Sequence, residues 1–127
     1  MIELYGWLSV RETYENEELF TQNIIDEITK NVQSIIENNK CIKLRYANGT
    51  PFINTLFCSN HRTNKTDEII ETYKRISETA SGSYGIIYLH DDEDKEHFNE
   101  FQIFVFKAIP HNDRLTALRA TCLHIFR

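Results

Sequence analysis

The residues best suited to chemistry gather in one short stretch, which lies between two apolar stretches. Residues 91–100, called the acidic tip below, contain the six carboxylates of Asp91, Asp92, Glu93, Asp94, Glu96 and Glu100. The lysine among them is Lys95, and His90 and His97 lie beside them. Because carboxylates at this density are costly to bury, the acidic tip must face water or a cationic partner. Its use is the main functional question that the sequence raises.

Metal binding or paired-acid catalysis is one use of these residues. Hard cations prefer several oxygen ligands, and the potential ligands are His90, Asp91, Asp92, Asp94 and His97. The spacing does not match a calcium-binding loop, which needs acids at alternate positions, a glycine at the sixth and a glutamate at the twelfth. The resemblance of Glu93-Asp94-Lys95 to half of a metal-nuclease signature rests on a very short match. A small metal-dependent hydrolase that uses His90, Asp91, Asp92 and His97 stays as an alternative.

Two other uses of the acidic tip need no catalysis. A solvated, charged loop keeps the edge of a sheet from pairing with another chain. A docking surface for a basic protein is the other use, because clustered carboxylates accelerate encounter with a cationic partner. They also imitate the phosphates that a nuclease binds. A second acidic cluster consists of Glu12, Glu15, Glu17 and Glu18, and its position before a predicted helix also gives it a structural explanation.

Composition limits the class of protein. The 127 residues carry a formal net charge of -5, which speaks against a general nucleic-acid binder, since such a protein should have a basic stripe. The cysteines Cys41, Cys58 and Cys122 lack zinc-site spacing and indicate reduced thiols in the cytosol. We expect neither a signal peptide nor a membrane span. Ser59 and His61 lack the Gly-x-Ser-x-Gly context of a nucleophile elbow, so a serine triad is not expected.

Hydrophobic periodicity predicts one α+β domain over residues 1–127. Strands are expected at Ile2–Val10, Cys41–Tyr46, Pro51–Ser59, Ser83–Leu89 and Glu100–Ala108. Helices are expected at Glu17–Asn38 and Thr66–Ala80, with a short basic helix at Leu115–Ile125. Asn48-Gly49 is a strong hairpin signal because both residues accept positive φ. The order β-α-β-β-α-β-β predicts a mostly antiparallel five-stranded sheet with both helices on one face.

Aromatic residues occupy alternate positions in two of these predicted strands. In Ile2–Val10, Trp7 shares one face with Tyr5, whereas the aliphatic residues lie on the other face. Tyr84 and Tyr88 belong to the strand at Ser83–Leu89. We expect Trp7, Tyr84 and Tyr88 to pack in the core or against the sheet. If they are exposed, they become candidate anchors for a partner, because tryptophan and tyrosine are over-represented among binding hot spots.

Five blocks of the sequence stand out together: Tyr5–Tyr14, Ser59–Arg62, Gly82–Tyr88, Asp91–Asp94 and Asn99–Val105. In this order they resemble the immunity-protein-seven family of bacterial polymorphic-toxin systems. Each block is short, and together they are specific over residues 1–108. The resemblance fades after Pro110, where this chain has a basic tail in place of the acidic one that we expect in the family.

The resemblance implies an α+β immunity protein made in the cytosol of a toxin-producing bacterium. Such a protein binds one cognate toxin domain and blocks it, as in contact-dependent growth inhibition, and no catalysis, cofactor, nucleic acid or membrane is implied. We therefore expect a non-enzymatic inhibitor, with a nuclease as one candidate toxin. The expected contact residues are Asp91, Asp92, Glu93, Asp94, Glu96, Glu12, Glu15, Glu17 and Glu18. A regulatory protein-binding module unrelated to toxins is a further alternative.

Overall fold

Six strands and two helices make up the computed structural model, which describes residues 1–12, 22–96, 98, 100–107 and, for the backbone only, 120–126. The strands are β1 (Ile2–Ser9), β2 (Ile42–Ala47), β3 (Thr50–Ser59), β4 (Tyr84–Asp91), β5 (Glu100–Phe106) and β6 (Ala120–Phe126). The helices are α1 (Gln22–Ile36) and α2 (Asn64–Thr79). The α+β class, the two main helices and the first five strands are confirmed in the expected order. The start of the helix expected at Glu17–Asn38 lies outside the described residues.

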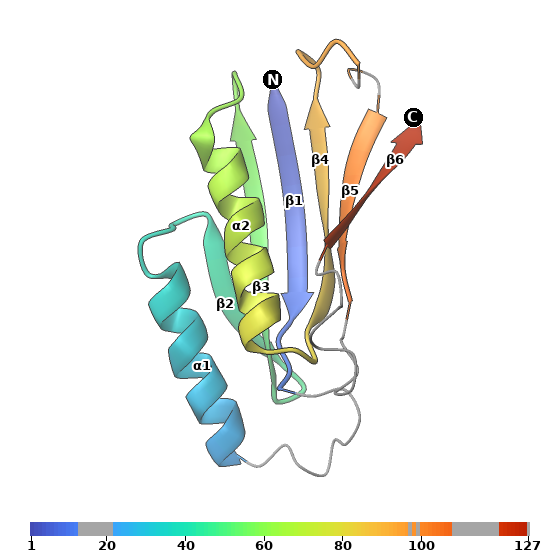
Figure 1. Ribbon diagram of the computed structural model, residues 1–127. Helices are drawn as coiled ribbons and strands as arrows, with labels where there is room; N and C mark the ends of the chain where they lie inside the picture. Colours follow the sequence, from blue (N-terminus) through green and yellow to red (C-terminus); the bar gives the residue numbers. More distant parts are fainter. Residues whose placement is uncertain (13–21, 97, 99, 108–119, 127) are drawn as a thin grey trace.

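The strands form one antiparallel sheet in the order β2-β3-β1-β4-β5-β6. β1 pairs along its whole length with β3 on one side and β4 on the other. Figure 1 shows α1 and α2 on the same side of this sheet. The turn between β2 and β3 has positive φ at Asn48 (52°) and Gly49 (73°), which confirms the hairpin signal. Neither of the described helices is long and apolar enough to cross a membrane.

The C-terminal segment differs from the prediction. A helix over Leu115–Ile125 is wrong from Ala120 onward, because β6 lies there and pairs with β5 from Glu100–Phe126 to Phe106–Ala120. The apolar spacing of so short a segment fits a helix and a strand equally. Pairing with β5 satisfies backbone groups that would otherwise form an open sheet edge. The sheet therefore has six strands, and the start of the expected helix lies outside the described residues.

The core fills the space between the sheet and the two helices. Alternate residues of β1 point into it, and Ile2, Leu4 and Leu8 are fully buried. The helices contribute apolar stripes, formed by Ile28, Val32 and Ile36 of α1 and by Ile69, Tyr73 and Ile76 of α2. Burial of each large apolar side chain stabilises the fold by about 1.5–3 kcal/mol. One face of the sheet thus supplies the core.

Tyr73 determines how closely α2 approaches β1. A Cβ atom added at Gly6 would lie 2.9 Å from the Tyr73 hydroxyl oxygen and 3.0 Å from Cγ1 of Ile87. The same hydroxyl group shares a hydrogen bond with Oγ1 of Thr55 in β3 (2.8 Å). Burial raises the pKa of Tyr73 well above its ordinary value. The missing side chain at Gly6 therefore lets α2 pack directly on the central strand.

The buried phenol predicts a loss of stability at alkaline pH. Tyr73 keeps its proton in the folded chain, whereas a tyrosine in the unfolded chain loses its proton above a pKa of about 10. The free energy of unfolding should therefore fall above about pH 10, by up to about 1.4 kcal/mol per pH unit from this residue. Urea denaturation of the wild type and of Tyr73→Phe between about pH 8 and 11 measures the difference.

In the Tyr73→Phe chain this part of the alkaline decline should be missing. The same substitution at the exposed Tyr46 is the matched control. A Tyr73→Phe chain that declines as steeply as the wild type would contradict the prediction.

Candidate functional site

The acidic tip connects β4 to β5 at the end of the sheet where β1 begins (Figure 1). The backbone N–H of Asp92 donates to the carbonyl of Met1 (3.3 Å). A carboxylate oxygen of Asp92 also accepts from the Met1 amino group (2.5 Å). This hydrogen bond raises the pKa of the amino group, and the negative charges of the tip add to the effect. The acidic tip is thus attached to the start of the central strand.

Asp91 differs from its neighbours because its side chain is only 9% exposed. One of its carboxylate oxygens accepts from the backbone N–H of Glu93 (3.0 Å), and the other lies 3.8 Å from the guanidinium group of Arg62. Arg62 also donates to Asp67 in α2 (3.0 Å). The backbone N–H of Asp94 donates to the carbonyl of Asp91 (3.3 Å). Asp91 therefore holds the turn in shape and connects it to α2.

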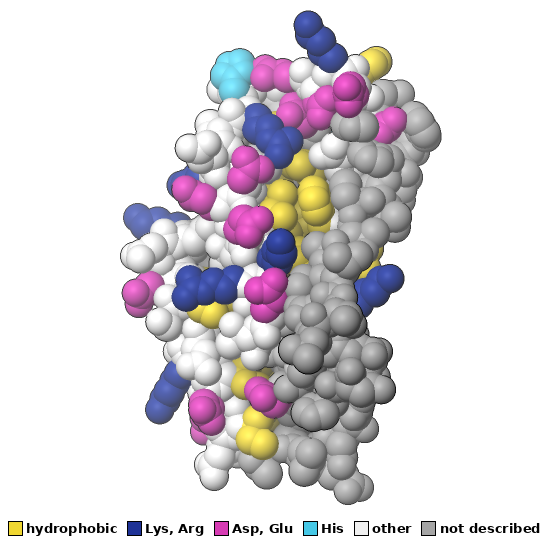
Figure 2. All heavy atoms as spheres, viewed as in Figure 1, with side chains coloured by type: hydrophobic (Ala, Val, Ile, Leu, Met, Phe, Trp, Pro, Cys, Tyr) yellow, Lys and Arg dark blue, Asp and Glu magenta, His cyan; other side chains and the backbone are white. Residues whose placement is uncertain are grey.

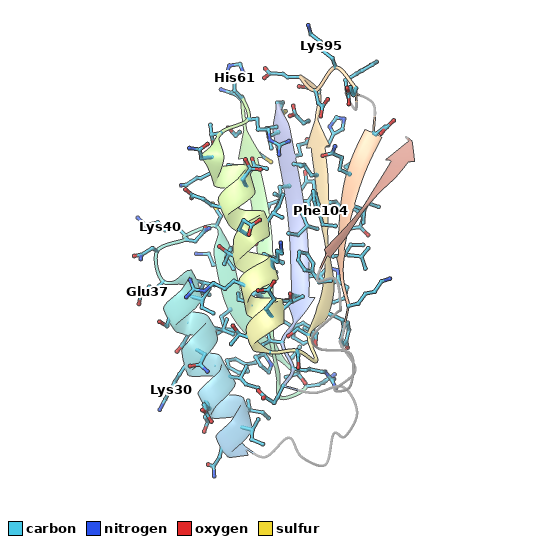
Figure 3. The ribbon with its side chains drawn as sticks, viewed as in Figure 1. Lys30, Glu37, Lys40, His61, Lys95 and Phe104 are labelled. Carbon is cyan, nitrogen blue, oxygen red and sulfur yellow. The ribbon has the colours of Figure 1, made fainter. Side chains whose placement is uncertain are left out.

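The other described carboxylates of this turn present their charge more openly. Asp92, Glu93 and Glu96 are exposed, and Asp94 is half-buried. Glu93 accepts from Nδ1 of His61 (2.7 Å), and Asp94 accepts from the backbone N–H of Glu96 (3.0 Å). Figure 2 shows acidic side chains gathered at this end of the molecule, and Figure 3 places His61 at the same end. In the described part of the tip, the carboxylates of Asp91, Asp92, Glu93 and Asp94 thus each accept a hydrogen bond.

The second predicted cluster lies elsewhere. Glu12 follows β1 and is exposed. Its backbone carbonyl accepts from the hydroxyl group of Ser81 (3.3 Å), which places it at the end of the sheet away from the acidic tip. Glu15, Glu17 and Glu18 lie outside the described residues. Glu12 therefore does not extend the surface formed by the tip.

The described residues of the alternative metal site, His90, Asp91 and Asp92, are not gathered into one group. Within the described ranges, no three His, Cys, Asp or Glu side chains are placed to hold a metal ion. Nε2 of His90 donates to the carbonyl of Phe98 (3.1 Å), and its Nδ1 lies 3.6 Å from a carboxylate oxygen of Glu3. Asp91 follows His90 in β4, so it points to the opposite face of the sheet. His97 lies outside the described residues.

Three aromatic residues that we expected in the core or against the sheet, Trp7, Tyr84 and Tyr88, lie exposed on its helix-free face. The aromatic face, as we call it, consists of Tyr5, Trp7, Leu56, Tyr84 and Tyr88, which are 37% to 70% exposed. Tyr5 stands opposite Leu56 in β3 and opposite Tyr88 in β4. Trp7 and Tyr84 meet edge to face, with ring centroids 6.3 Å apart. Trp7, Tyr84 and Tyr88 are thus not core residues. Their position on alternate residues of the strands was the signal in the sequence that could have predicted their exposure.

The aromatic face is hollowed on one side. Trp7, Tyr84 and Tyr88 line a shallow depression of about 440 Å³, which Ile86 and Val105 also line. Partial desolvation and then the charge of the neighbouring Glu3 raise the pKa of Tyr5. The face therefore offers partly exposed aromatic rings around a shallow depression.

Comparison with known proteins places nearly the whole chain in one family model. The model described as Immunity protein 7 matches residues 1–118. The matched range includes β1 to β5, both described helices and the acidic tip. It also extends past Pro110, where the resemblance of the separate blocks fades. No curated protein and no solved structure matches the chain.

The buried contacts of Asp91 predict a larger structural role for it than for the exposed Glu96. Asp91→Ala removes the acceptor for the Glu93 N–H and the partner of Arg62, so it should lower the free energy of unfolding by about 1–3 kcal/mol. Glu96→Ala, at an exposed position, should change it by less than about 0.5 kcal/mol. Urea denaturation compares the two variants. Equal effects of the two substitutions would show that Asp91 has no special role in the turn.

Proposed function

The chain belongs to the Immunity protein 7 family, and we propose that it binds one cognate toxin domain and neutralises it by non-covalent occlusion. In this proposal the chain has no catalytic activity of its own. It acts in the cytosol of the toxin-producing cell and of its siblings, as one member of a contact-dependent or other polymorphic-toxin pair. The family match carries the proposal, because it includes the sheet from β1 to β5, both described helices and the acidic tip.

The acidic tip favours a toxin with a cationic surface. Asp92, Glu93, Asp94 and Glu96 lie on a turn that Asp91 and the start of β1 hold in place. Charges clustered in this way steer a cationic partner during encounter and repel acidic ones. A nuclease has a cationic surface where it binds phosphates, so a nuclease domain is the toxin class that we propose.

The second acidic cluster, Glu12, Glu15, Glu17 and Glu18, is proposed as a separate contact. β1 separates Glu12 from the acidic tip by 8 residues, or about 26 Å at the usual rise of a strand. A standard interface covers about 800 Å² on each partner and is about 30 Å across. One toxin domain therefore reaches both clusters only if it lies along the length of the sheet.

Co-expression with the toxin domain encoded immediately upstream tests the proposal. The two chains should elute as one complex, and growth should be rescued in cells that make both. A toxin domain from an unrelated pair controls for specificity, because immunity should be limited to the cognate toxin. Failure of the folded chain to form a complex and to rescue growth would overturn the proposed function.

Charge reversal of the acidic tip should slow association with the toxin. Asp92→Lys, Glu93→Lys and Glu96→Lys together leave Asp91 in place, and they should raise Kd by well over tenfold, chiefly through the association rate. Surface plasmon resonance at two salt concentrations measures this effect, and the variant should also lose much of the salt dependence.

A matched control carries the same change in net charge on the helices, as Glu27→Lys, Glu37→Lys and Glu78→Lys, all at exposed positions. This control should bind nearly as the wild type does. If both triple variants lose the same affinity, net charge rather than the acidic tip accounts for the effect.

A further inference from the structure

Exposed apolar surface is concentrated on the aromatic face. Of the eight large hydrophobic side chains that are exposed among the described residues, five belong to this face. Four of the five are rings, and at about 40% exposure they leave roughly 300 Å² uncovered, since each free ring offers roughly 200 Å². Leu56, which is 70% exposed, adds to this area. Patches of roughly 300–600 Å² are the largest on typical monomers and are often functional.

The rings contact one another and the neighbouring strands in the free chain. Tyr5 and Tyr88 stand opposite each other on adjacent strands, and Trp7 meets the edge of Tyr84. The guanidinium group of Arg11 lies 5.9 Å from the centroid of the Tyr84 ring. Side chains held on paired strands lose little conformational freedom on binding, and Tyr and Trp contribute large contact areas. The arrangement therefore lowers the entropy cost of binding a partner.

Opposite charges lie at the two ends of the aromatic face. At one end, the contact between His90 and Glu3 joins the Tyr5–Tyr88 pair to the acidic tip. At the other end, the cations Arg11, Arg45 and Lys107 outnumber the exposed Glu12 that follows Arg11. Arg45 lies on the helix-free side as well, where its Nε donates to Asn54 (3.1 Å). A complementary partner needs a basic side, an apolar centre and an acidic side.

From this arrangement we infer that the aromatic face anchors the cognate toxin, an inference that rests on the proposed function. The toxin places its basic side against the acidic tip and its acidic side against Arg11, Arg45 and Lys107. Trp7, Tyr84 and Tyr88 then contact the apolar centre of the toxin. The charges of the tip set the association rate, and the desolvated rings set the dissociation rate.

A toxin fits this face better than a second copy of the chain. Each partner of a standard interface buries roughly 800 Å², and the aromatic face alone supplies about half of this area. The adjoining acidic tip supplies the remaining area. Two copies would each bring a net charge of -5 to the contact, which opposes association. The exposed tyrosines also give the face polar hydroxyl groups, whereas permanent homodimer interfaces are more apolar.

Substitution of two anchor residues tests the inference in the complex of the full chain with its toxin domain. Trp7→Ala and Tyr88→Ala should each raise Kd by at least tenfold, mainly through faster dissociation in surface plasmon resonance. Tyr46→Ala is the matched control, because Tyr46 is 55% exposed and hydrogen-bonded to Thr29 of α1. That control should keep the wild-type dissociation rate. Unchanged dissociation in both anchor variants, with the wild-type complex intact, overturns the inference and leaves the proposed function standing.

The alkylation rate of a cysteine in the unsubstituted chain, measured with and without toxin, makes the test independent of the folding of any variant. Cys58 is exposed and stands opposite Glu3 beside Tyr5, on the same face of the sheet. Its alkylation by a maleimide should slow at least tenfold in the complex, whereas the half-buried Cys41 near α1 should react at the same rate with and without toxin. Unchanged alkylation of Cys58 in the complex overturns the inference. A homodimer of the free chain that Trp7→Ala disrupts also overturns it, in favour of a second copy.

Discussion

The close contact between α2 and β1 is the feature on which the rest of the structure depends. Tyr73 lies against Gly6 without an intervening side chain, and its hydroxyl group joins α2 to Thr55 of β3. This contact fixes which face of the central strand is the core. Because strand residues alternate between faces, the same contact leaves the other residues of β1, including Trp7, on the opposite side of the sheet. This one contact therefore separates the core face of the sheet from the face that we propose for toxin binding.

In the proposed complex with a toxin, the acidic tip and the aromatic face have different physical roles. Long-range attraction between exposed charges is screened by salt and mainly affects encounter. Desolvation of rings acts only at contact and mainly affects lifetime. Within the tip, Asp91 is tied to Arg62 and the backbone, so the neighbouring carboxylates keep a defined arrangement. An ordered cluster of charges gives orientation as well as attraction, which a loose acidic loop would not.

The sequence predicts those features of the fold that depend on local pattern. Five strands and two helices have clear periodicity, and Asn48-Gly49 has the chemistry of its turn. The strand β6 was not predictable in the same way, because its identity depends on pairing with β5 rather than on its own short pattern. Likewise, sequence alone does not distinguish Asp91 from its acidic neighbours. That distinction requires Arg62, which lies far away along the chain and meets Asp91 only in the folded molecule.

Trp7 is the single tryptophan of the chain and lies 42% exposed on the helix-free face, against the edge of Tyr84. Tryptophan emission in this protein is therefore a signal from the surface of the sheet and not from the core. Displacement of water from the indole shifts its emission to shorter wavelength. The protein thus carries an intrinsic optical reporter at the centre of its aromatic face, and emission wavelength follows the solvation of that face without any added dye.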